Sequence, residues 1–459
     1  MIVVPEDRRL HRGLERLEAA REDLELLDRH YRGDQDQPYV PRKAKAEYKR
    51  LAENATSAWL RLVVEAIAER MRLEGIRGRG DQAGDLEAWR ILEANRMMAV
   101  QSQIYTECLK LGKAFVSVWP NATDPSTPVI RGESPLRVYV EREALDFTPV
   151  WAVKKIAAET PDGQTIERSF LYDAREVVRY TRTHGSGQWQ EEGRIPNPLR
   201  RVPFVEFPND PDLLGETASE IAPLLPIQHR INSTNLNMQL AMIYSAYRQR
   251  WATGMAIPED DDGNPVEPFN AAVDRLWIGE SPDIRFGEFS ESNLANYVTV
   301  LDSLVRQLAA ISQVPPHYLL GQLVNLSGDA IKAAEAGLVS KVQGKLLVAG
   351  EAWSRVLDLV AVAGGRVQTP CEPVWADPST RTEGQIVDAL TKLGAPPIAI
   401  PQEALWERYG ASPATIARWK RMQADASQRA SAAQTSGALF GAQLPEPDDA
   451  EVVPLDEAA

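Results

Sequence analysis

Apolar residues recur every three or four positions over three stretches at the start of the chain, which is the spacing of amphipathic helices. Leucines form the first stripe, from Leu10 to Leu27, with acids and arginines between them. The same spacing predicts helices over about 43–73 and about 86–111, joined by a glycine-rich loop. We therefore expect this first part of the chain to be helical.

The pattern changes after residue 115, where β-branched and aromatic residues gather between prolines and glycines. Such segments are typical of strands. Strands are predicted at 115–119, 137–140, 151–156 and 177–181, and the stretch 185–211 is predicted to be mainly loop.

Helical spacing returns over about 216–251, and the unbroken part is expected to start near Ile227 because two prolines precede it. The next apolar stripe, from Leu294 to Leu308, predicts a helix that stops at the proline pair 315–316. These two helices enclose an irregular segment that looks like a small inserted subdomain.

A very long helix is predicted to begin at Ser327, which is a good N-cap residue, and to end at the glycine pair 364–365. Shorter helices follow over about 382–422, and an acidic tail after residue 430 is predicted to be disordered. The pattern therefore indicates a mainly α protein with a strand-rich α+β section.

The amino-acid composition excludes several classes of protein. The 459 residues are 44% hydrophobic and 25% charged, which fits about three folded domains. A net charge of −14 argues against a protein that coats nucleic acid, because such proteins are usually basic. Two distant cysteines, Cys108 and Cys371, exclude a disulfide scaffold and a zinc finger, and a run of about 18 apolar residues is absent, so no membrane span is expected.

Catalytic motifs are absent from the sequence. It contains no phosphate-binding glycine loop followed by Lys and Ser or Thr, no zinc-protease helix motif and no serine-hydrolase elbow. The acidic run 259–262 could attract a divalent cation, but it lacks the spacing of a known calcium loop, and a solvated turn is the favoured interpretation. We expect no catalytic residue, no metal and no cofactor.

An uncharged run stands out in a chain that is one-quarter charged. No Asp, Glu, Lys or Arg occurs from Gln307 to Gly328. The run could be a buried connection between two packed helices. It could also be a loop that touches a moving polyanion, since Lys or Arg there would grip phosphates and slow the movement.

Three segments carry a resemblance to a known family. The first is Leu27–Asp34 followed by Pro38–Pro41, the second is the tract that starts at Asn232 and runs to Arg250, and the third is Ile311–Gly321 followed by Asn325–Ile331. In these segments, and in the order of elements from about residue 10 to 425, the chain resembles the tailed-phage portal proteins of the SPP1-type, Gp6-like family.

The resemblance implies a ring, usually of twelve subunits, at one capsid vertex of the virion, assembled in the host cytoplasm. Helical stem, strand-containing wing, small clip and helical crown would surround a channel for double-stranded DNA during packaging and ejection. Partners would be the terminase, the major capsid protein and scaffold, and a head–tail adaptor, without a membrane. A ring of chains with net charge −14 would repel DNA at long range, which suits a conduit.

The resemblance also implies the domain limits. They are 1–215 for the wing, 216–252 and 291–313 for the stem helices, 253–290 for the clip, 314–327 for the tunnel loop, 328–375 for the long wing helix and its connection, 376–430 for the crown and 431–459 for the tail.

The implied site residues follow from these limits. The tunnel loop would present Pro315, Pro316, His317, Tyr318, Leu319, Leu320, Gly321, Gln322, Leu323, Val324, Asn325 and Leu326 to DNA. The clip contacts would include Glu259, Asp260, Asp261 and Asp262.

Two other functions compete with this interpretation. One is another virion structural or head–tail connection protein, against which the length of the chain argues. The other is a multidomain enzyme whose site is assembled from scattered residues, which a single sequence leaves open.

Overall fold

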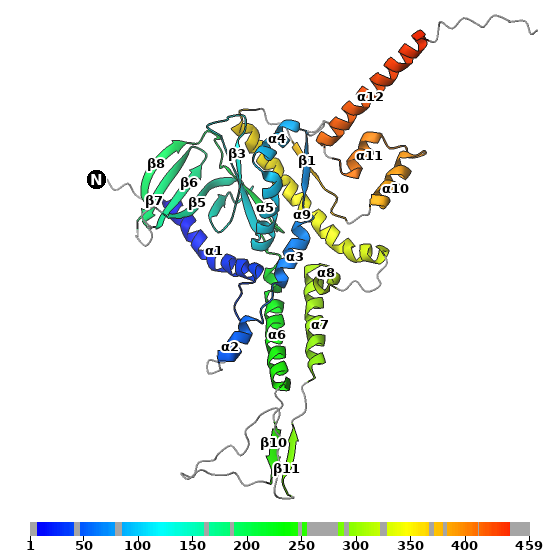
Figure 1. Cartoon of the computed structure of the whole chain (residues 1–459). Helices are drawn as coiled ribbons and strands as arrows, with labels where there is room; N and C mark the ends of the chain where they lie inside the picture. The colour runs from blue at the N-terminus through cyan, green and yellow to red at the C-terminus, as the bar shows by residue number, and fades with distance from the viewer. Residues whose placement is uncertain are drawn as a thin grey trace, which may run out of the picture. The chain divides into compact units, whose positions relative to one another are not determined.

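The structure is a computed structural model of the whole chain. It describes residues 7–40, 46–78, 85–159, 165–183, 188–246, 250–254, 283–288, 293–321, 328–366, 371–379, 383–411 and 413–440. Figure 1 labels the elements.

Helices make up most of the described chain. The α-helices are α1 (Arg8–Arg32), α2 (Ala46–Glu53), α3 (Trp59–Ala68), α4 (Leu86–Ala94), α5 (Met97–Leu111), α6 (Leu225–Ala246), α7 (Leu294–Ser312), α8 (Pro316–Leu320), α9 (Gly328–Ala363), α10 (Glu383–Gly394), α11 (Gln402–Tyr409) and α12 (Pro413–Phe440), with a 3-10 turn η1 (Ala222–Leu224) before α6. The strands are β1 (Leu73–Gly78), β2 (Lys113–Trp119), β3 (Val129–Glu133), β4 (Val138–Arg142), β5 (Pro149–Glu159), β6 (Thr165–Asp173), β7 (Glu176–Thr183), β8 (Gln190–Pro196), β9 (Phe204–Pro208), β10 (Arg250–Thr253), β11 (Arg285–Glu288) and β12 (Cys371–Trp375).

The chain divides into two compact units. The first contains Met1–Arg72, Leu92–Gln368 and Pro378–Thr380, and the second contains Leu73–Ile91, Thr369–Asp377 and Arg381–Ala459. Each is described by itself.

Two antiparallel sheets form the strand-rich part of the first unit. Five strands lie in the order β4-β5-β6-β7-β8, and three lie in the order β3-β2-β9. Helix α1 packs on the five-stranded sheet, where Leu10 and Leu17 join a buried cluster with Trp151 and Val153. A Cβ atom at Gly13 would lie 2.6 Å from a Val153 methyl group, so the close approach of helix and sheet requires glycine there.

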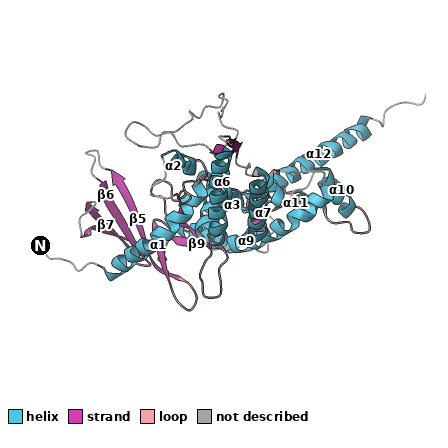
Figure 2. Ribbon diagram, turned by 90° about the horizontal axis from the view of Figure 1, so that it is seen from below, coloured by secondary structure: helices cyan, strands magenta, loops and turns pink. Residues whose placement is uncertain are grey.

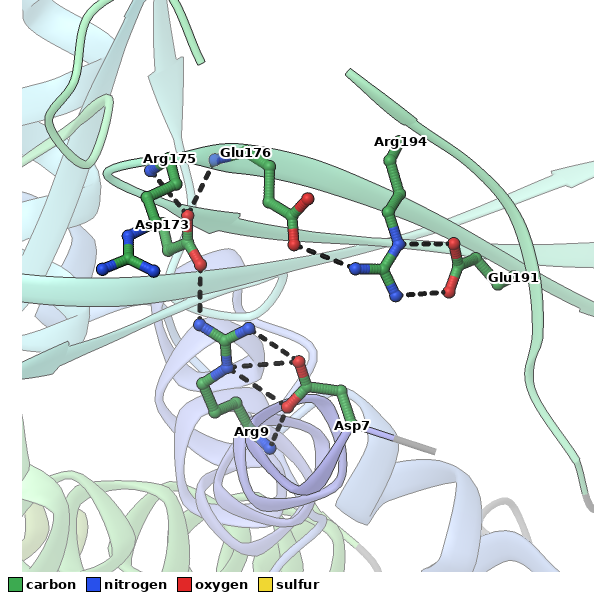
Figure 3. Close-up of polar contacts among 7 residues, drawn as sticks. All are labelled: Asp7, Arg9, Asp173, Arg175, Glu176, Glu191 and Arg194. Atoms are coloured by element: carbon green, nitrogen blue, oxygen red, sulfur yellow. Dashed lines mark hydrogen bonds and ion pairs between the residues drawn. The ribbon is translucent and has the colours of Figure 1, made fainter. Parts of the chain in front are cut away.

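Polar contacts fix the start of α1 on this sheet. The Asp7 carboxylate caps the helix by accepting from the Arg9 backbone N–H at 2.9 Å. The Arg9 guanidinium then reaches Asp173 at the end of β6, 2.7 Å away (Figure 3). The Asp173 carboxylate also accepts from the backbone N–H groups of Arg175 and Glu176, so one side chain organises both the turn and the helix contact.

Helix α9 supplies the largest fully buried side chain among the described residues of the first unit. Trp353 is fully buried, packs edge-on against Phe207 with 5.3 Å between ring centres, and donates its indole N–H to the Tyr105 hydroxyl at 2.8 Å. Helix α9 therefore joins α5 to β9.

Helices α6 and α7 pack side by side (Figures 1 and 2). Asn293 caps α7 by accepting from the Ala295 N–H. Strands β10 and β11 form an antiparallel pair beyond these helices, and a Cβ atom at Gly287 would lie 2.3 Å from the Trp251 ring. The indole thus lies directly on the glycine of the partner strand.

The second unit contains the antiparallel pair β1 and β12, together with α10, α11 and α12. Trp406 of α11 and Trp419 of α12 pack edge-on, 5.4 Å apart between ring centres. Its strand pair was not anticipated by the sequence pattern, because each strand is short and the partners are about three hundred residues apart in the chain.

The structure confirms the mixed, mainly α fold class and corrects several boundaries. The helix predicted over 43–73 is two helices, because the carbonyl of Ser57 accepts from Gln35 at 2.6 Å and Gln228 at 2.8 Å, which holds the chain out of helical geometry there. The helix predicted over 86–111 is interrupted at Arg96, which has φ 57°. Helix α12 continues to Phe440, where the tail was predicted, because this alanine-rich stretch favours helix.

Candidate functional site

The predicted loop after α7 begins with a short helix in place of an irregular chain. Gln313 has φ 59° and ends α7, Pro316 opens α8, and Gly321 has φ 64° and ends α8. A proline tolerates the first helical position, and a glycine tolerates a positive φ. The first half of the loop therefore contains a short helix with defined ends, whereas Gln322, Leu323, Val324, Asn325 and Leu326 lie outside the described residues.

The described loop residues divide into buried and exposed groups. Pro315 and Leu319 are buried, Tyr318 is 38% exposed, and Gly321 is exposed. Leu319 therefore anchors α8 in the core, and the rest of α8 lies nearer the surface.

Tyr318 is held by two charged side chains from distant elements. Its hydroxyl accepts from Arg70, just after α3, and donates to Glu335 of α9, with both distances 2.6 Å. The guanidinium of Arg70 also lies 5.2 Å from the centre of the tyrosine ring, a cation–π arrangement. Burial and the Glu335 carboxylate raise the pKa of Tyr318, so the hydroxyl keeps its proton at neutral pH.

Charges near the loop are engaged with one another. Arg70 and Glu335 lie 3.8 Å apart, with side chains only 13% and 6% exposed. The His317 ring stacks at a tilt on Tyr318, and its Nε2 atom lies 4.0 Å from Glu335. The buried charges Arg70 and Glu335 beside the described part of the uncharged run are thus engaged with each other.

Replacing Tyr318 by phenylalanine should lower the free energy of unfolding by about 1–3 kcal/mol, because Arg70 and Glu335 would lose the hydroxyl that joins them. Urea titration followed by circular dichroism would measure the loss. Tyr39, which is 85% exposed, offers a matched control, since its replacement by phenylalanine should leave stability unchanged. Equal stability of both variants would show that the hydroxyl does not anchor α8.

A second charged cluster ties the start of α6 and the end of α7 to α9. The buried Glu220 carboxylate, which precedes α6, contacts Lys341 at 2.6 Å and also Lys345. Lys341 donates to the carbonyl of Ser312 at the end of α7, 3.0 Å away, and Lys345 donates to the Asn209 side chain at 2.7 Å. Burial would raise the pKa of Glu220, but the two ammonium groups outweigh it and lower the pKa to about 2.

Neither the cluster around Tyr318 nor the cluster around Glu220 was predicted from the sequence. A signal was present, because the spacing that buries Leu338 and Val342 also places Glu335 and Lys345 on the buried side of α9. Charged residues at such positions are nearly always paired when buried. The sequence could indicate that partners exist, but not that they come from positions before α6 and after α3.

Most of helix α6 is uncharged, like the loop. From Ile231 to Ala246 it contains no charged residue, and its polar side chains are amides and hydroxyls. Arg230 is the last charge before this neutral part. Helix α7 carries only Asp302 and Arg306.

The acidic run Glu259–Asp262 lies outside the described residues. Within the described residues, no group of three or more metal-binding side chains comes together, and none of the helices is long and apolar enough to cross a membrane.

One crevice of about 250 Å³ lies between α5 and β3, lined in part by Glu107, Glu133 and Ser134. Lys110 contacts Glu107 at 2.7 Å, and Lys154 contacts Glu133 at 2.5 Å. Both carboxylates are therefore engaged in ion pairs, as expected of structural groups.

Comparison with known proteins gives consistent matches. A family model described as phage portal protein, SPP1 Gp6-like, matches residues 10–429. The portal protein of Mycobacterium phage D29 is 32% identical over 392 residues, which cover 79% of this chain and 78% of that protein. The portal protein of Mycobacterium phage L5 is 32% identical over 355 residues, which cover 72% and 71%.

Two solved structures are more distant. The neck of a native GTA particle, computed with C12 symmetry, gives a TM-score of 0.46 at 12% identity, covering 81% of this chain and 94% of that chain. The neck of an empty GTA particle, computed with C6 symmetry, gives 0.44 at 12% identity, covering 82% and 95%.

Proposed function

The chain belongs to the SPP1 Gp6-like family of phage portal proteins, and from this premise we propose that it forms a ring of twelve subunits through which double-stranded DNA is packaged and ejected. A portal protein is a structural component of the virion at the capsid vertex and not an enzyme. The paired carboxylates of the α5 crevice agree with a structural role.

The proposed parts of the subunit follow the order of the elements. We assign residues 1–215 to the wing, α6 and α7 to the stem, 253–290 to the clip, 314–327 to the tunnel loop, and 376–430 to the crown. The side-by-side packing of α6 and α7, with the strand pair β10 and β11 beyond them, supports the stem and clip assignments (Figure 1).

The uncharged run carries the proposal for the channel. Residues 307–328 contain no charge, and the nearest buried charges, Arg70 and Glu335, are engaged with Tyr318. A DNA phosphate passing this loop would meet apolar groups, amides and a hydroxyl, so no strong ion pair would hold it. We infer that the loop supports DNA laterally and lets it slide.

The proposed partners follow from the same assignment. The clip, with its acidic run Glu259–Asp262, would meet the terminase during packaging and the head–tail adaptor afterwards. The outer wing would meet the major capsid protein and scaffold.

Replacing Gln322 by lysine should reduce DNA packaging to roughly a tenth of normal, because each subunit would add a cation that binds passing phosphates. Ring assembly should be unchanged. Packaged DNA per capsid would be measured by nuclease protection, and rings would be counted by electron microscopy. The neutral variant Gln322→Asn serves as the control and should package normally.

Asn325→Lys provides an independent site in the same loop and should act in the same direction. Normal packaging in both lysine variants would contradict the tunnel-loop assignment while leaving the family membership untouched.

A further inference from the structure

Four large apolar side chains are exposed together at one end of the five-stranded sheet. Leu145 is 92% exposed, Leu213 99% and Leu214 80%, and Phe147 is 40% exposed. They belong to two turns, residues 143–148 and 210–216, which we call the acidic leucine patch. Exposed apolar side chains scattered singly are ordinary, but four on two adjoining turns point to an interaction surface.

The two turns are fixed against each other. The Phe147 ring lies on Gly215, where a Cβ atom would come within 2.6 Å of it. Arg142 donates to the Gly215 carbonyl at 2.8 Å and lies 5.6 Å from the centre of the Phe147 ring. Phe147 holds φ 57°, an unfavourable value for an aromatic residue, so the surrounding contacts impose this geometry.

The turn that presents the leucines is also rigid. The Asp212 carboxylate accepts from the backbone N–H groups of Leu214 at 2.9 Å and Glu216 at 2.8 Å. The Asp212 carbonyl accepts from Gly215 at 3.0 Å. A turn ordered in this way presents Leu213 and Leu214 with little conformational entropy left to lose on binding.

Charge identifies the chemistry of the partner surface. The two turns of the acidic leucine patch contain five acidic residues and no Lys or Arg, and one of the five, Asp210, is paired with Lys345 of α9 at 2.6 Å. The surface that covers them must therefore be apolar and basic.

The opposite edge of the same sheet has this chemistry. Residues 193–201 contain three arginines and no acid, and Ile195 is 54% exposed. Arg175 belongs to the same surface, because Asn197 donates its backbone N–H to the Arg175 carbonyl and its side chain to the Arg201 carbonyl. We call residues 193–201 with Arg175 the basic edge.

Contacts within the sheet fix this edge as well. Arg194 contacts Glu176 of β7 at 3.0 Å and Glu191 of its own strand at 2.6 Å (Figure 3). Arg200 and Arg201, which follow β8, are exposed.

The two surfaces lie at the same level of the subunit. Strands β4 and β8 are the two outer strands of the sheet. The strand register places the turn after β4, the turn after β6 and the end of β8 at one end of the sheet, since Trp151 faces Asp173 and Glu176 faces Pro196. A ring requires two different patches on opposite sides of each subunit, joined by one rotation.

We propose that the acidic leucine patch of one subunit seats on the basic edge of the neighbouring copy in the ring. This inference rests on the proposed ring and identifies which wing surfaces close it. The occupant is a second copy of this chain, because the same sheet supplies both the acidic and the complementary basic surface at one level.

Charge reversal tests the contact. The variant Glu143→Arg/Asp146→Arg/Glu216→Arg leaves the patch with three arginines and two acids, so both surfaces become basic. The variant Arg175→Glu/Arg200→Glu/Arg201→Glu leaves the edge with one arginine and three glutamates, so both surfaces become acidic. Each alone should lower the fraction of rings at least about tenfold at equal concentration, because like charges would face each other. An equimolar mixture should restore rings in which the two variants alternate. Native mass spectrometry, with one variant isotopically labelled, would measure ring fraction and composition.

Two further variants show whether a loss of rings is specific to this contact. Glu15→Arg/Glu18→Arg/Glu22→Arg makes the same charge change on the exposed side of α1 and should assemble as wild type does. Leu213→Ser/Leu214→Ser removes apolar contact without changing charge, so its ring fraction should fall and mixing should not restore it.

The possible results distinguish the proposed ring from the proposed contact within it. A wild-type chain that stays monomeric would overturn the proposed ring itself. Wild-type rings together with normal rings from both charge-reversed variants, or no rescue on mixing, would overturn the assigned contact alone. Normal rings that fail to incorporate into capsids would assign the acidic leucine patch to another virion protein and would also overturn it.

Discussion

Replacing Glu220 by glutamine is expected to lower the free energy of unfolding by about 3–5 kcal/mol, because two buried lysines would lose their shared carboxylate. Lys341 and Lys345 have side chains that are 15% and 7% exposed, so water cannot replace the lost partner fully. Urea titration of the purified chain would measure the change. Glu216→Gln removes an exposed acid in the same segment and should leave stability within about 0.5 kcal/mol of wild type.

The same carboxylate should make stability depend on acid pH. Its pKa falls from an ordinary 4.5 to about 2 in the folded chain, because the two ammonium groups outweigh the effect of burial. A lowered pKa stabilises the fold above the unfolded value, and this contribution disappears as the pH falls toward 2. Wild type should therefore lose about 3 kcal/mol from this group between pH 5 and pH 2. The Glu220→Gln variant should lack this loss of stability between pH 5 and pH 2. If wild type and variant lost equal stability over this range, the loss would not come from Glu220.

Replacing Trp353 by alanine should cost about 3–5 kcal/mol, because it would empty the largest fully buried site in the described core. The change would also remove the indole donor from Tyr105 and the edge-on contact with Phe207. Thermal unfolding monitored by near-ultraviolet circular dichroism would follow the loss.

Two controls separate the causes of that loss. Trp353→Phe keeps an aromatic ring and should lower the free energy of unfolding less than Trp353→Ala does. The difference between the two variants measures the cost of the larger cavity that alanine leaves. Arg355→Ala alters the exposed side of α9, where the arginine is 70% exposed, and should change stability by no more than about 0.5 kcal/mol. An alanine variant as stable as the Arg355 variant would mean that the core repacks around the vacancy.

Helices with strong local signals could be predicted closely from the sequence. Helix α7 ends where Val314 precedes two prolines, and α9 ends at a glycine pair, as expected. These boundaries depend on residues next to the helix end, so local physics is sufficient to define them.

Boundaries set by distant partners could not be predicted. The interruption between α2 and α3 depends on Gln35 and Gln228, which reach Ser57 from other elements. Strands β8 and β9 fall in a stretch rich in proline and glycine, and they form because β7 and β2 offer them partners. Long-range pairing of this kind leaves a weak trace in sequence spacing.

The candidate site could be predicted only in part. The sequence drew attention to the uncharged run and to its flanking helices, and the family comparison confirmed the portal identity. It did not indicate that residues 316–320 are helical, nor that Tyr318 is held between Arg70 and Glu335. Contacts between three separate elements are set by tertiary packing, which a local pattern does not encode.

Lys341 gives the subunit a mechanical property. A single ammonium group grips the carboxylate that precedes α6 and the terminal carbonyl of α7. A displacement of either helix relative to α9 would therefore stretch or break a charge-assisted contact of Lys341, so this one side chain opposes movement of both helices against α9.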